Sequence, residues 1–355
     1  MSAHLTNYSY STDPLGLRGE EWLQLSPHCR KQKVEKAFRF WREHGFPYYR
    51  LTRDEVRYEF ARVLKLDCRK IFARDNLRSS NAGLKLANAF QPNMWRARVS
   101  RYLSPADVFN DDRLLAKAIE RSLRIWPDRF GANASCLRRI LRSFSGAASV
   151  SNYRPAVAKA IISSYSKEGS VVVDFSAGYG GRLLGALTLN RHYWGIEVNK
   201  NQVKGYQRMR RAILQAGFEL RPSRFLNACA EHALPELPSA VCSLVFSSPP
   251  FFDWERYSCS PEQSFNRYRT YELWKSEFLL PVLLESYRVL EKTGYLVLNV
   301  TGGLRRPTRP EVLLLGSRIG FKLVGTHKMI FPKVPYLHPR DGNPTKKEFL
   351  LVFRK

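Results

Sequence analysis

The spacing of apolar residues changes character near the middle of the chain. From Pro27 to about Ser143, apolar side chains recur three and four positions apart, which predicts amphipathic helices. Thr52, Ser104 and Ser135 stand where such helices would begin, because their hydroxyls accept a hydrogen bond from the first turn. No run rich in β-branched residues interrupts this half, so we expect a mainly helical N-terminal domain.

Beyond the segment SGAASVSNYRP, short β-branched runs alternate with amphipathic stretches. Strands that alternate with helices form a parallel sheet covered on both faces, so we expect an α/β fold. Only a loop separates the last two strands, which predicts a terminal antiparallel hairpin. The predicted strands are Ser170–Phe175, His192–Val198, Ala240–Phe246, Gly294–Val300, Gly320–Phe331 and Glu348–Lys355, with one more just before Asn227.

The length and composition favour two domains. A chain of 355 residues with 44% hydrophobic content can bury one large core or two modest ones. The change of pattern places the boundary, so that residues 1–145 form a helical, basic domain and residues 146–355 an α/β domain. The first two dozen residues are rich in Ser, Thr, Tyr and Gly and are expected to form a flexible arm.

The charge of the chain points to a polyanionic partner. The formal net charge is +27 and the pI is near 10.1. Basic residues are interleaved with aromatic ones in both halves, as in FRFWREHGFPYYR and ERYSCSPEQSFNRYRTYELWK, a pattern typical of nucleic-acid-binding proteins. Nucleic acid is therefore the expected partner, with an anionic membrane surface as the alternative.

Other classes of protein are disfavoured by what the chain lacks. No apolar run approaches the length of a membrane span, and MSAHLTNYSYSTDPLG has neither the basic start nor the apolar centre of a signal peptide. We expect a protein of the cytoplasm, or of the nucleus in a eukaryote, that is neither secreted nor bound to a membrane. The six cysteines lie far apart, with no CxxC pair and no histidine at ligand spacing, so neither a metal site nor a disulfide framework is expected.

A glycine-rich turn follows the first predicted strand of the second half. In VVVDFSAGYGGRLLGAL, Asp174 ends the strand, and Gly178, Gly180 and Gly181 open a helix. Glycines let the backbone pass close to a ligand. Glu197 ends the next strand, where an acidic side chain accepts hydrogen bonds from both hydroxyls of a ribose. Taken alone, the glycines could form a tight turn and Glu197 could be an ordinary charged residue at the surface. Because both stand at strand ends in this order along the chain, they favour a site for a nucleotide-like cofactor.

The segment DFSAGYGGR resembles the D-x-x-x-G-x-G motif of Rossmann-fold methyltransferases that bind S-adenosylmethionine. The resemblance covers roughly Ser151 to Lys355 and implies a seven-stranded Rossmann-like methyltransferase sheet with a terminal antiparallel hairpin. SNYRP stands where that family contacts the methionine end of the cofactor, and NACAE where it contacts the adenine ring. The implied cofactor-binding residues are Tyr153, Arg154, Pro155, Asp174, Ser176, Gly178, Gly180, Glu197, Cys229 and Ala230.

Two adjacent prolines follow the strand that ends at Phe246. The sequence Ser248, Pro249, Pro250, Phe251 resembles the [S/D/N]-P-P-[Y/F/W] motif of methyltransferases that modify exocyclic amino groups of nucleobases. The prolines fix the backbone, so that the Ser248 hydroxyl and the Pro249 carbonyl are held as acceptors for the two hydrogens of an –NH2 group.

This arrangement turns the nitrogen lone pair toward the methyl donor, and in-line displacement then needs no covalent enzyme intermediate. Phe251 would stack on a base that has left the duplex. The four residues Ser248–Phe251 are thus the predicted catalytic residues. The alternative is a rigid turn closed by an aromatic side chain.

The resemblance implies a site-specific DNA methyltransferase. A serine at the first motif position is commoner among cytosine-N4 members, so cytosine N4 is favoured and adenine N6 is the close alternative. The chain has no Pro-Cys dipeptide, which argues against methylation of a ring carbon. An RNA base amino-methyltransferase and a non-catalytic nucleic-acid-binding module stay open, while the glycine spacing disfavours an NAD-dependent oxidoreductase.

Loops that follow parallel strands emerge at one edge of a sheet, so three basic, aromatic loops are expected to flank the pocket and contact the phosphate backbone. The helical half would close the other side of a cleft and read sequence, or serve only as a clamp. The expected partner is double-stranded DNA, with RNA as the alternative. The predicted nucleic-acid-binding residues are Trp254, Arg256, Tyr257, Arg267, Arg269, Arg305, Arg306, Lys333, Tyr336, Arg340 and Lys346.

Overall fold

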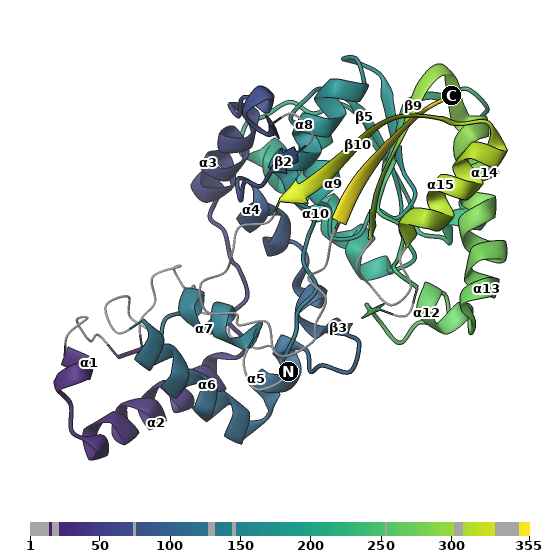
Figure 1. The fold of residues 1–355 in the computed structure, drawn as a ribbon. Helices are drawn as coiled ribbons and strands as arrows, with labels where there is room; N and C mark the ends of the chain where they lie inside the picture. Colours follow the sequence, from purple (N-terminus) through teal and green to yellow (C-terminus); the bar gives the residue numbers. More distant parts are fainter. Residues whose placement is uncertain are drawn as a thin grey trace. The chain divides into compact units, whose positions relative to one another are not determined.

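The chain divides into two compact units, which Figure 1 shows in a computed structural model. The helical unit consists of Met1–Arg50 and Pro92–Ser151, and the sheet unit of Leu51–Gln91 and Asn152–Lys355. The structure describes residues 14–15, 21–73, 76–126, 132–143, 147–252, 254–301, 308–330 and 348–355. Most of the predicted N-terminal arm lies outside these residues.

The helical unit is built around Trp41, whose indole nitrogen donates a hydrogen bond of 3.0 Å to the carbonyl of Ala132. The predicted caps Thr52, in the sheet unit, and Ser104 each accept a backbone N–H and form a capping box. The predicted cap Ser135 is wrong, because the Asn133 side chain accepts from the backbone of the third residue after it. The described elements of this unit are α1 (Glu21–Gln24), α2 (Pro27–His44), η2 (Pro92–Arg96), β3 (Arg98–Val99), α5 (Pro105–Asn110), α6 (Asp112–Ile125) and α7 (Ala134–Leu141).

The sheet unit alternates strands with helices over most of its length. Its strands are β1 (Phe72–Ala73), β2 (Asn76–Arg78), β4 (Val171–Asp174), β5 (His192–Ile196), β6 (Ser223–Leu226), β7 (Cys242–Ser247), β8 (Glu255–Arg256), β9 (Leu290–Thr301), β10 (Lys322–Ile330) and β11 (Glu348–Arg354). Its helices are α3 (Arg53–Leu64), η1 (Cys68–Lys70), α4 (Leu84–Ala89), α8 (Pro155–Tyr165), α9 (Gly181–Leu187), α10 (Lys200–Gln215), α11 (Ala230–Ala233), α12 (Ser264–Arg267), α13 (Tyr271–Trp274), the π-helical turn η4 (Lys275–Leu279), α14 (Leu280–Val289) and α15 (Thr308–Ile319).

The main sheet has the strand order β1-β2-β10-β11-β9-β7-β4-β5-β6. The strands β6, β5, β4, β7 and β9 pair in parallel, and β11 runs antiparallel to both β9 and β10. The seven predicted strands and the terminal antiparallel hairpin are therefore confirmed. The chain proceeds from β4 to β6 on one side and resumes at β7 on the other, so the carboxyl ends of β4 and β7 mark the switch point of the sheet.

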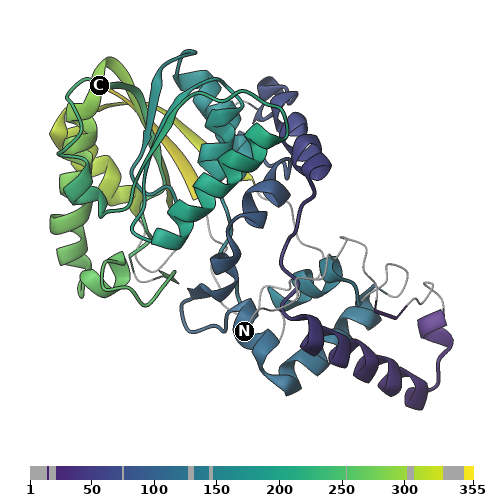
Figure 2. The same cartoon turned by 180° about the vertical axis from the view of Figure 1, so that it is seen from behind.

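Helices cover both faces of this sheet (Figures 1 and 2). Alternate strand residues explain the two layers: Val172 packs into the core beneath α8, α9 and α10, whereas the next residue, Val173, packs into the core beneath α11, α14 and α15. Each face of the sheet is therefore closed by its own set of apolar helix faces.

The division into units differs from the predicted boundary at residue 145. The apolar face of α3, with Val56, Phe60 and Val63, packs into the same core as α8 and α9. The buried Lys159 of α8 donates hydrogen bonds of 2.7–3.1 Å to three carbonyls at the end of α3, a cation at a helix C-terminus. Residues Leu51–Gln91 consequently belong to the sheet unit.

The expectation that no strand interrupts the first half is also wrong. β2 pairs in parallel with residues Lys328–Ile330 of β10, and β1 pairs antiparallel with β2. Strands of two and three residues carry too little pattern to be predicted. They form because the edge of β10 offers unpaired backbone groups.

Candidate active site

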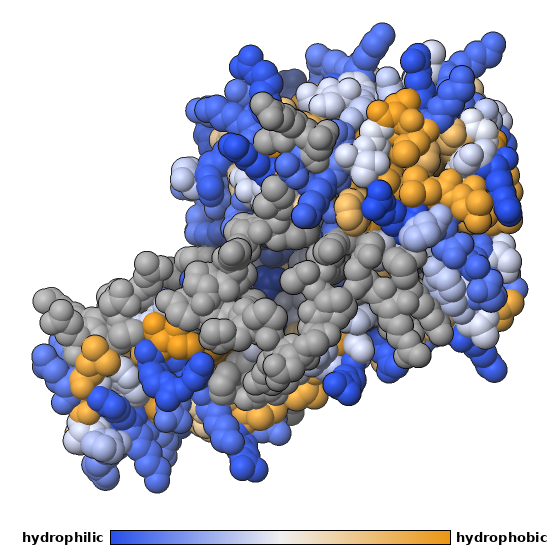
Figure 3. Space-filling view, viewed as in Figure 1, coloured by the Kyte–Doolittle hydropathy of each residue, from blue (hydrophilic) through white to orange (hydrophobic). Residues whose placement is uncertain are grey.

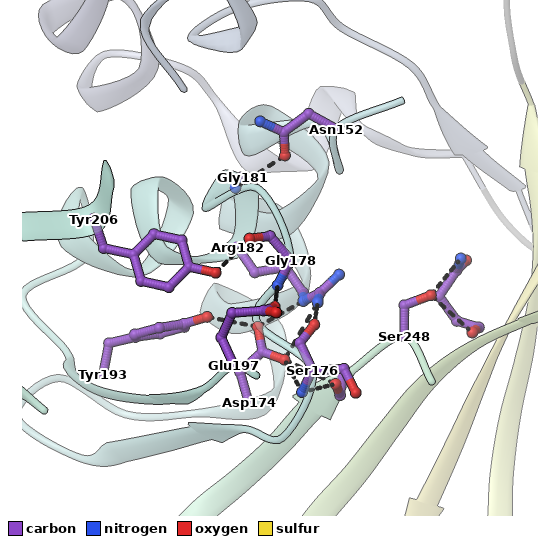
Figure 4. A network of polar contacts seen from close by, with 12 residues as sticks. Asn152, Asp174, Ser176, Gly178, Gly181, Arg182, Tyr193, Glu197, Tyr206 and Ser248 are labelled. Carbon is purple, nitrogen blue, oxygen red and sulfur yellow. Dashed lines mark hydrogen bonds and ion pairs between the residues drawn. The ribbon is translucent and has the colours of Figure 1, made fainter. Parts of the chain in front are cut away.

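Asp174, at the carboxyl end of β4, is buried, and its carboxylate is occupied by donors of the protein (Figure 4). Oδ2 accepts hydrogen bonds from Arg182 Nε at 2.7 Å and from the Tyr193 hydroxyl at 2.5 Å, and Oδ1 accepts from Ser247 Oγ at 2.8 Å and Ser176 N at 3.3 Å. Burial and the neighbouring Asp174 raise the pKa of Tyr193 well above its ordinary value. The predicted cofactor ligand Asp174 thus holds the glycine loop in place, with its oxygens turned to the protein.

The start of α9 is pinned to the segment before α8. Asn152 is buried, and its Oδ1 accepts a hydrogen bond of 3.1 Å from the backbone N–H of Gly181. A Cβ at Gly181 would stand 1.8 Å from the carbonyl oxygen of Tyr153, so only glycine fits there. Asn152 was not among the predicted site residues, although it directly precedes three of them. The segment SNYRP therefore acts first as a support for the loop.

The other two glycines of the loop adopt a backbone that other residues avoid. Gly178 has φ +61° and Gly180 has φ +79°. Tyr206 of α10 donates its hydroxyl to the carbonyl of Gly178, and its ring lies 3.2 Å from the position of a Cβ at Gly180. The glycine turn is therefore fixed from β4, from α8 and from α10.

Glu197 directly follows β5, close to the predicted strand end, and faces the glycine loop (Figure 4). Its carboxylate accepts hydrogen bonds from the backbone N–H of Gly178 at 2.9 Å and of Asn199 at 3.0 Å. Burial raises the pKa of Glu197 to about 7, against the opposing effect of these two hydrogen bonds. Each oxygen keeps a lone pair for a further donor, so the carboxylate is equipped to accept a pair of hydroxyls.

Two tyrosine hydroxyls next to the loop have no partner within the described part of the chain. The hydroxyls of Tyr153 and Tyr179 are buried there without a hydrogen bond. Burial raises the pKa of both. Tyr179 packs edge-on against Tyr257 at 6.1 Å, which brings this predicted nucleic-acid ligand to the glycine loop instead. Buried hydroxyls normally find partners, so a polar ligand fits at this place.

The remaining predicted cofactor residues have mixed surroundings. Arg154 donates a hydrogen bond of 3.4 Å to Asn81, and Pro155 is buried as the first residue of α8. Cys229 is buried before α11, and its thiol donates a hydrogen bond of 2.9 Å to the Glu262 carboxylate. Burial and this hydrogen bond raise the pKa of Cys229 to about 12. Ala230 is buried beside it, so this segment offers apolar surface rather than a reactive thiolate.

The Pro-Pro motif leaves β7 at the switch point of the sheet. Ser247, the last residue of β7, donates a hydrogen bond to Asp174 and accepts one of 3.1 Å from the backbone N–H of Ser176. Ser248 follows, half-buried, and Phe251 is 7% exposed, so a base would meet only a small part of that ring. Phe252 has φ +49°, an unusual conformation for a bulky residue and a mark of local strain.

Asn299 and Glu348 adjoin Ser248 and were missed by sequence reasoning. They belong to β9 and β11, which pair antiparallel. The Asn299 amide nitrogen lies 3.4 Å from Ser248 Oγ and 2.9 Å from Glu348 Oε2. The signal in the sequence was a single amide within the apolar run GYLVLNV, which sequence alone could not connect to a carboxylate almost 50 positions later.

The predicted nucleic-acid ligands differ in their surroundings. Arg256 and Arg269 are exposed, and the Arg256 guanidinium stacks 4.2 Å from the ring of Phe265. Arg267 is paired with two carboxylates, those of Glu231 and Glu262, at 3.3 and 3.0 Å. Trp254 is half-buried. The predicted residues outside the described ranges are Arg305, Arg306, Lys333, Tyr336, Arg340 and Lys346.

On the face seen in Figure 3, the described residues form a mainly hydrophilic surface with an apolar area over α14, α15 and the start of β10 and smaller apolar areas on the helical unit. Among the residues that the structure describes, no three His, Cys, Asp or Glu side chains are grouped so that they would hold a metal ion. In the same residues, no helix combines the length and apolar character needed to cross a membrane.

No protein-family model and no curated protein matches the chain. Among solved structures, the chain is similar to precorrin-6y C5,15-methyltransferase from Geobacter metallireducens, with 16% identity over 57% of this chain and 88% of that one and a TM-score of 0.37. It is similar to a SAM-dependent methyltransferase from Methanosarcina mazei, with 13% identity over 55% and 96% of the chains and a TM-score of 0.39. The chain is also similar to TrmN from Thermus thermophilus, with 19% identity over 57% of this chain and 48% of that one and a TM-score of 0.35. At such TM-scores the fold assignment depends on the strand order described above, and the function on the chemistry of the site.

Proposed function

We propose that the sheet unit transfers a methyl group from S-adenosylmethionine to an exocyclic amino group of a nucleobase in DNA, with cytosine N4 favoured over adenine N6. One observation carries the proposal. Ser247, the residue directly before the Pro-Pro motif, is hydrogen-bonded through Oγ to both Asp174 and Ser176, so the start of the motif is fixed next to the glycine loop. The junction lies at the switch point of the sheet, where open α/β sheets bind their ligands.

The residues around the glycine loop suit S-adenosylmethionine. The Glu197 carboxylate would accept hydrogen bonds from the ribose hydroxyls, and the buried Tyr179 hydroxyl would find in the cofactor the partner it lacks among the described residues. The apolar segment at Cys229 and Ala230 would border the adenine. When bound, the cofactor supplies an electrophilic methyl group.

The chain itself holds and activates the acceptor nitrogen. Ser248 Oγ and the Pro249 carbonyl would accept the two hydrogens of the base –NH2, which fixes its orientation and raises the electron density on nitrogen. No protein nucleophile is required, and the buried thiol of Cys229, with its pKa raised to about 12, is not one. Flipping of the base out of the duplex would be needed to reach this depth.

The charge of the chain supports a nucleic acid as the macromolecular substrate. The net charge of +27 favours binding of a phosphate backbone at physiological salt. Arg256 and Arg269 are exposed after β7, on the segment that follows the motif. Double-stranded DNA is the proposed substrate, and RNA serves as the alternative substrate in the same methylation assay.

The first experiment is incubation with tritiated S-adenosylmethionine and duplex DNA of mixed sequence, followed by nucleoside digestion and mass spectrometry. We expect label in N4-methylcytosine. Label in N6-methyladenine would keep the reaction and change the base, and label only on a transcript would change the nucleic acid. Cofactor binding without any transfer to either acid would refute the enzyme and leave a binding module.

Two adjacent serines provide a matched pair for the proposed roles. S248A should lower kcat by about 10²-fold, within the range for loss of one preorganised polar contact to the reacting group, and leave cofactor affinity nearly unchanged. S247A removes the link to Asp174 and Ser176 and should weaken cofactor binding as well. Equal loss of cofactor binding in both variants would show that the motif is only structural.

A further inference from the structure

Ser248 is one end of a row of three polar groups that crosses β7, β9 and β11. Asn299 is 2% exposed and Glu348 is 9% exposed, so both side chains lie inside the sheet unit. The Asn299 amide nitrogen donates to Glu348 Oε2 at 2.9 Å and to Ser248 Oγ at 3.4 Å. Ser248 Oγ in turn donates to the backbone carbonyl of Asn299 at 3.4 Å.

The donors and acceptors in this row leave one arrangement of hydrogens. Glu348 Oε2 accepts a hydrogen bond from the –NH2 of Asn299, and this contact fixes the orientation of the amide. The second amide hydrogen then points to Ser248 Oγ, and the Ser248 hydroxyl hydrogen is directed to the Asn299 carbonyl. Ser248 Oγ keeps one lone pair and has no hydrogen left to donate elsewhere.

We propose that Glu348 and Asn299 are positioning residues that hold the Ser248 hydroxyl as an acceptor, so that the site admits an amino group and rejects a keto oxygen. The inference rests on the proposed function and deepens it by naming what sets its selectivity. A hydroxyl that turned freely would accept from –NH2 and donate to C=O equally well. Because its hydrogen is donated to the Asn299 carbonyl, the Ser248 hydroxyl can only accept, as the Pro249 carbonyl does. A keto oxygen at this place would meet the lone pairs of two acceptors and would be repelled.

A further atom supports this assignment. Asn299 Oδ1 is buried and has no hydrogen-bond partner in the part of the chain that the structure describes. Buried acceptors without partners are rare. It belongs to the amide whose nitrogen lies 3.4 Å from Ser248 Oγ, so the row of polar groups next to the motif has an acceptor without a donor.

The test replaces the polar pair with an apolar pair of similar volume. N299L alone would leave the Glu348 carboxylate without the amide, whereas N299L/E348M removes both partners, an exchange that is often neutral for stability in a protein interior. The backbone carbonyl of residue 299 stays, but the amide that fixes the hydroxyl is gone. E348Q is the conservative partner variant, because its amide oxygen still accepts from Asn299.

The readouts are the unfolding midpoint, the affinity for S-adenosylhomocysteine, kcat, and the preference for an amino base. The preference is the ratio of Kd values for two duplexes that differ at the methylated base: cytosine against uracil, or adenine against hypoxanthine. We expect the wild-type protein to prefer the amino base by about tenfold or more, in line with the cost of an unpaired polar group. E348Q should keep the preference within about threefold of wild type.

The apolar double variant separates positioning from folding. It should retain the unfolding midpoint and cofactor affinity, yet lose at least about tenfold in kcat and most of the preference. A folded double variant with wild-type kcat and preference would overturn the inference and leave the proposed function standing. A wild-type protein that transfers no methyl group to nucleic acid would refute the proposed function, and the inference with it.

Discussion

The half-buried carboxylate of Glu197 makes the stability of the sheet unit depend on pH in a direction opposite to that of most acidic residues. Its pKa is raised by burial to about 7 from an ordinary value of 4.5. A raised pKa means that the folded state binds the proton more tightly than the unfolded chain. The stabilising contribution is therefore complete below pH 4.5 and is lost as the pH rises through 7.

The size of the effect follows from the two pKa values. Raising the pKa from 4.5 to about 7 corresponds to about 3.4 kcal/mol between the fully protonated and the fully ionised limits. Between pH 5 and pH 8, the stabilising contribution of Glu197 to the free energy of unfolding falls by about 2.5 kcal/mol of this total. E197Q also loses one of the backbone hydrogen bonds from Gly178 and Asn199, but that loss does not depend on pH.

The assay compares free energies of unfolding of wild type and E197Q at half-unit intervals from pH 5 to pH 8. The difference between the two should shift by about 2.5 kcal/mol in favour of E197Q as the pH rises. A titration of ¹³C-carboxyl-labelled glutamate, with the Glu197 signal assigned from its absence in E197Q, measures the pKa directly. E219Q, which removes an exposed carboxylate, is the matched control.

Cofactor binding adds a second, independent readout. Hydroxyl donors favour the ionised carboxylate, so the affinity of wild type for S-adenosylmethionine should rise as the pH passes 7, and that of E197Q should not. A pH-independent difference in stability between wild type and E197Q would refute the burial argument. A parallel pH dependence of cofactor affinity in both proteins would refute the ribose role.

Three further predictions test the support of the glycine loop and the charged surface. G181A places a Cβ 1.8 Å from the Tyr153 carbonyl and should cost about 3 kcal/mol of unfolding free energy, measured with urea. R182M leaves the Asp174 carboxylate buried without its cation and should cost about 3–5 kcal/mol in the same assay. R269A should reduce the slope of log K against log salt for DNA binding by about 1, measured by fluorescence anisotropy.

Each of these predictions has a control within the chain. G178A meets nothing nearer than 3.7 Å, so it should lose only about 1–2 kcal/mol through its positive φ. D174N/R182M removes both charges and should recover part of the stability lost in R182M. K167A removes an exposed cation before β4, at the opposite edge of the sheet, and should leave the salt slope as it is. Equal effects of a variant and its control would contradict the corresponding assignment.

The parts of the fold that were predicted are those that local sequence determines. Val171–Asp174 and its glycine turn form one continuous pattern, because strand, turn and helix follow each other within a dozen residues. The Pro-Pro motif likewise shows its rigidity in its own residue types. Glu197 could be placed at a strand end for the same reason, although its pKa depends on burial that the sequence does not show.

The parts that were missed depend on contacts between distant positions. α3 reads as one more amphipathic helix, and nothing local shows that Lys159 caps it from 95 residues away. The pairing of Asn299 with Glu348 needs β11 to insert between β9 and β10, which only the topology supplies. Arg267 was predicted from its charge alone, whereas its two carboxylate partners come from other segments.

Several energetically unfavourable features of the sheet unit lie close to the glycine loop and the Pro-Pro motif. The positive φ of Phe252, the partnerless hydroxyls of Tyr153 and Tyr179 within the described residues, and the raised pKa of Glu197 all lie at the glycine loop or just beyond the Pro-Pro motif. Well-ordered interiors satisfy such groups, and strain that persists beside a rigid support is typical of functional sites. A ligand with hydroxyl and amino groups would supply hydrogen-bond partners to the tyrosine hydroxyls and to Glu197 at the same time. Its binding should therefore raise the free energy of unfolding of the sheet unit by more than its contacts to the glycine loop alone would.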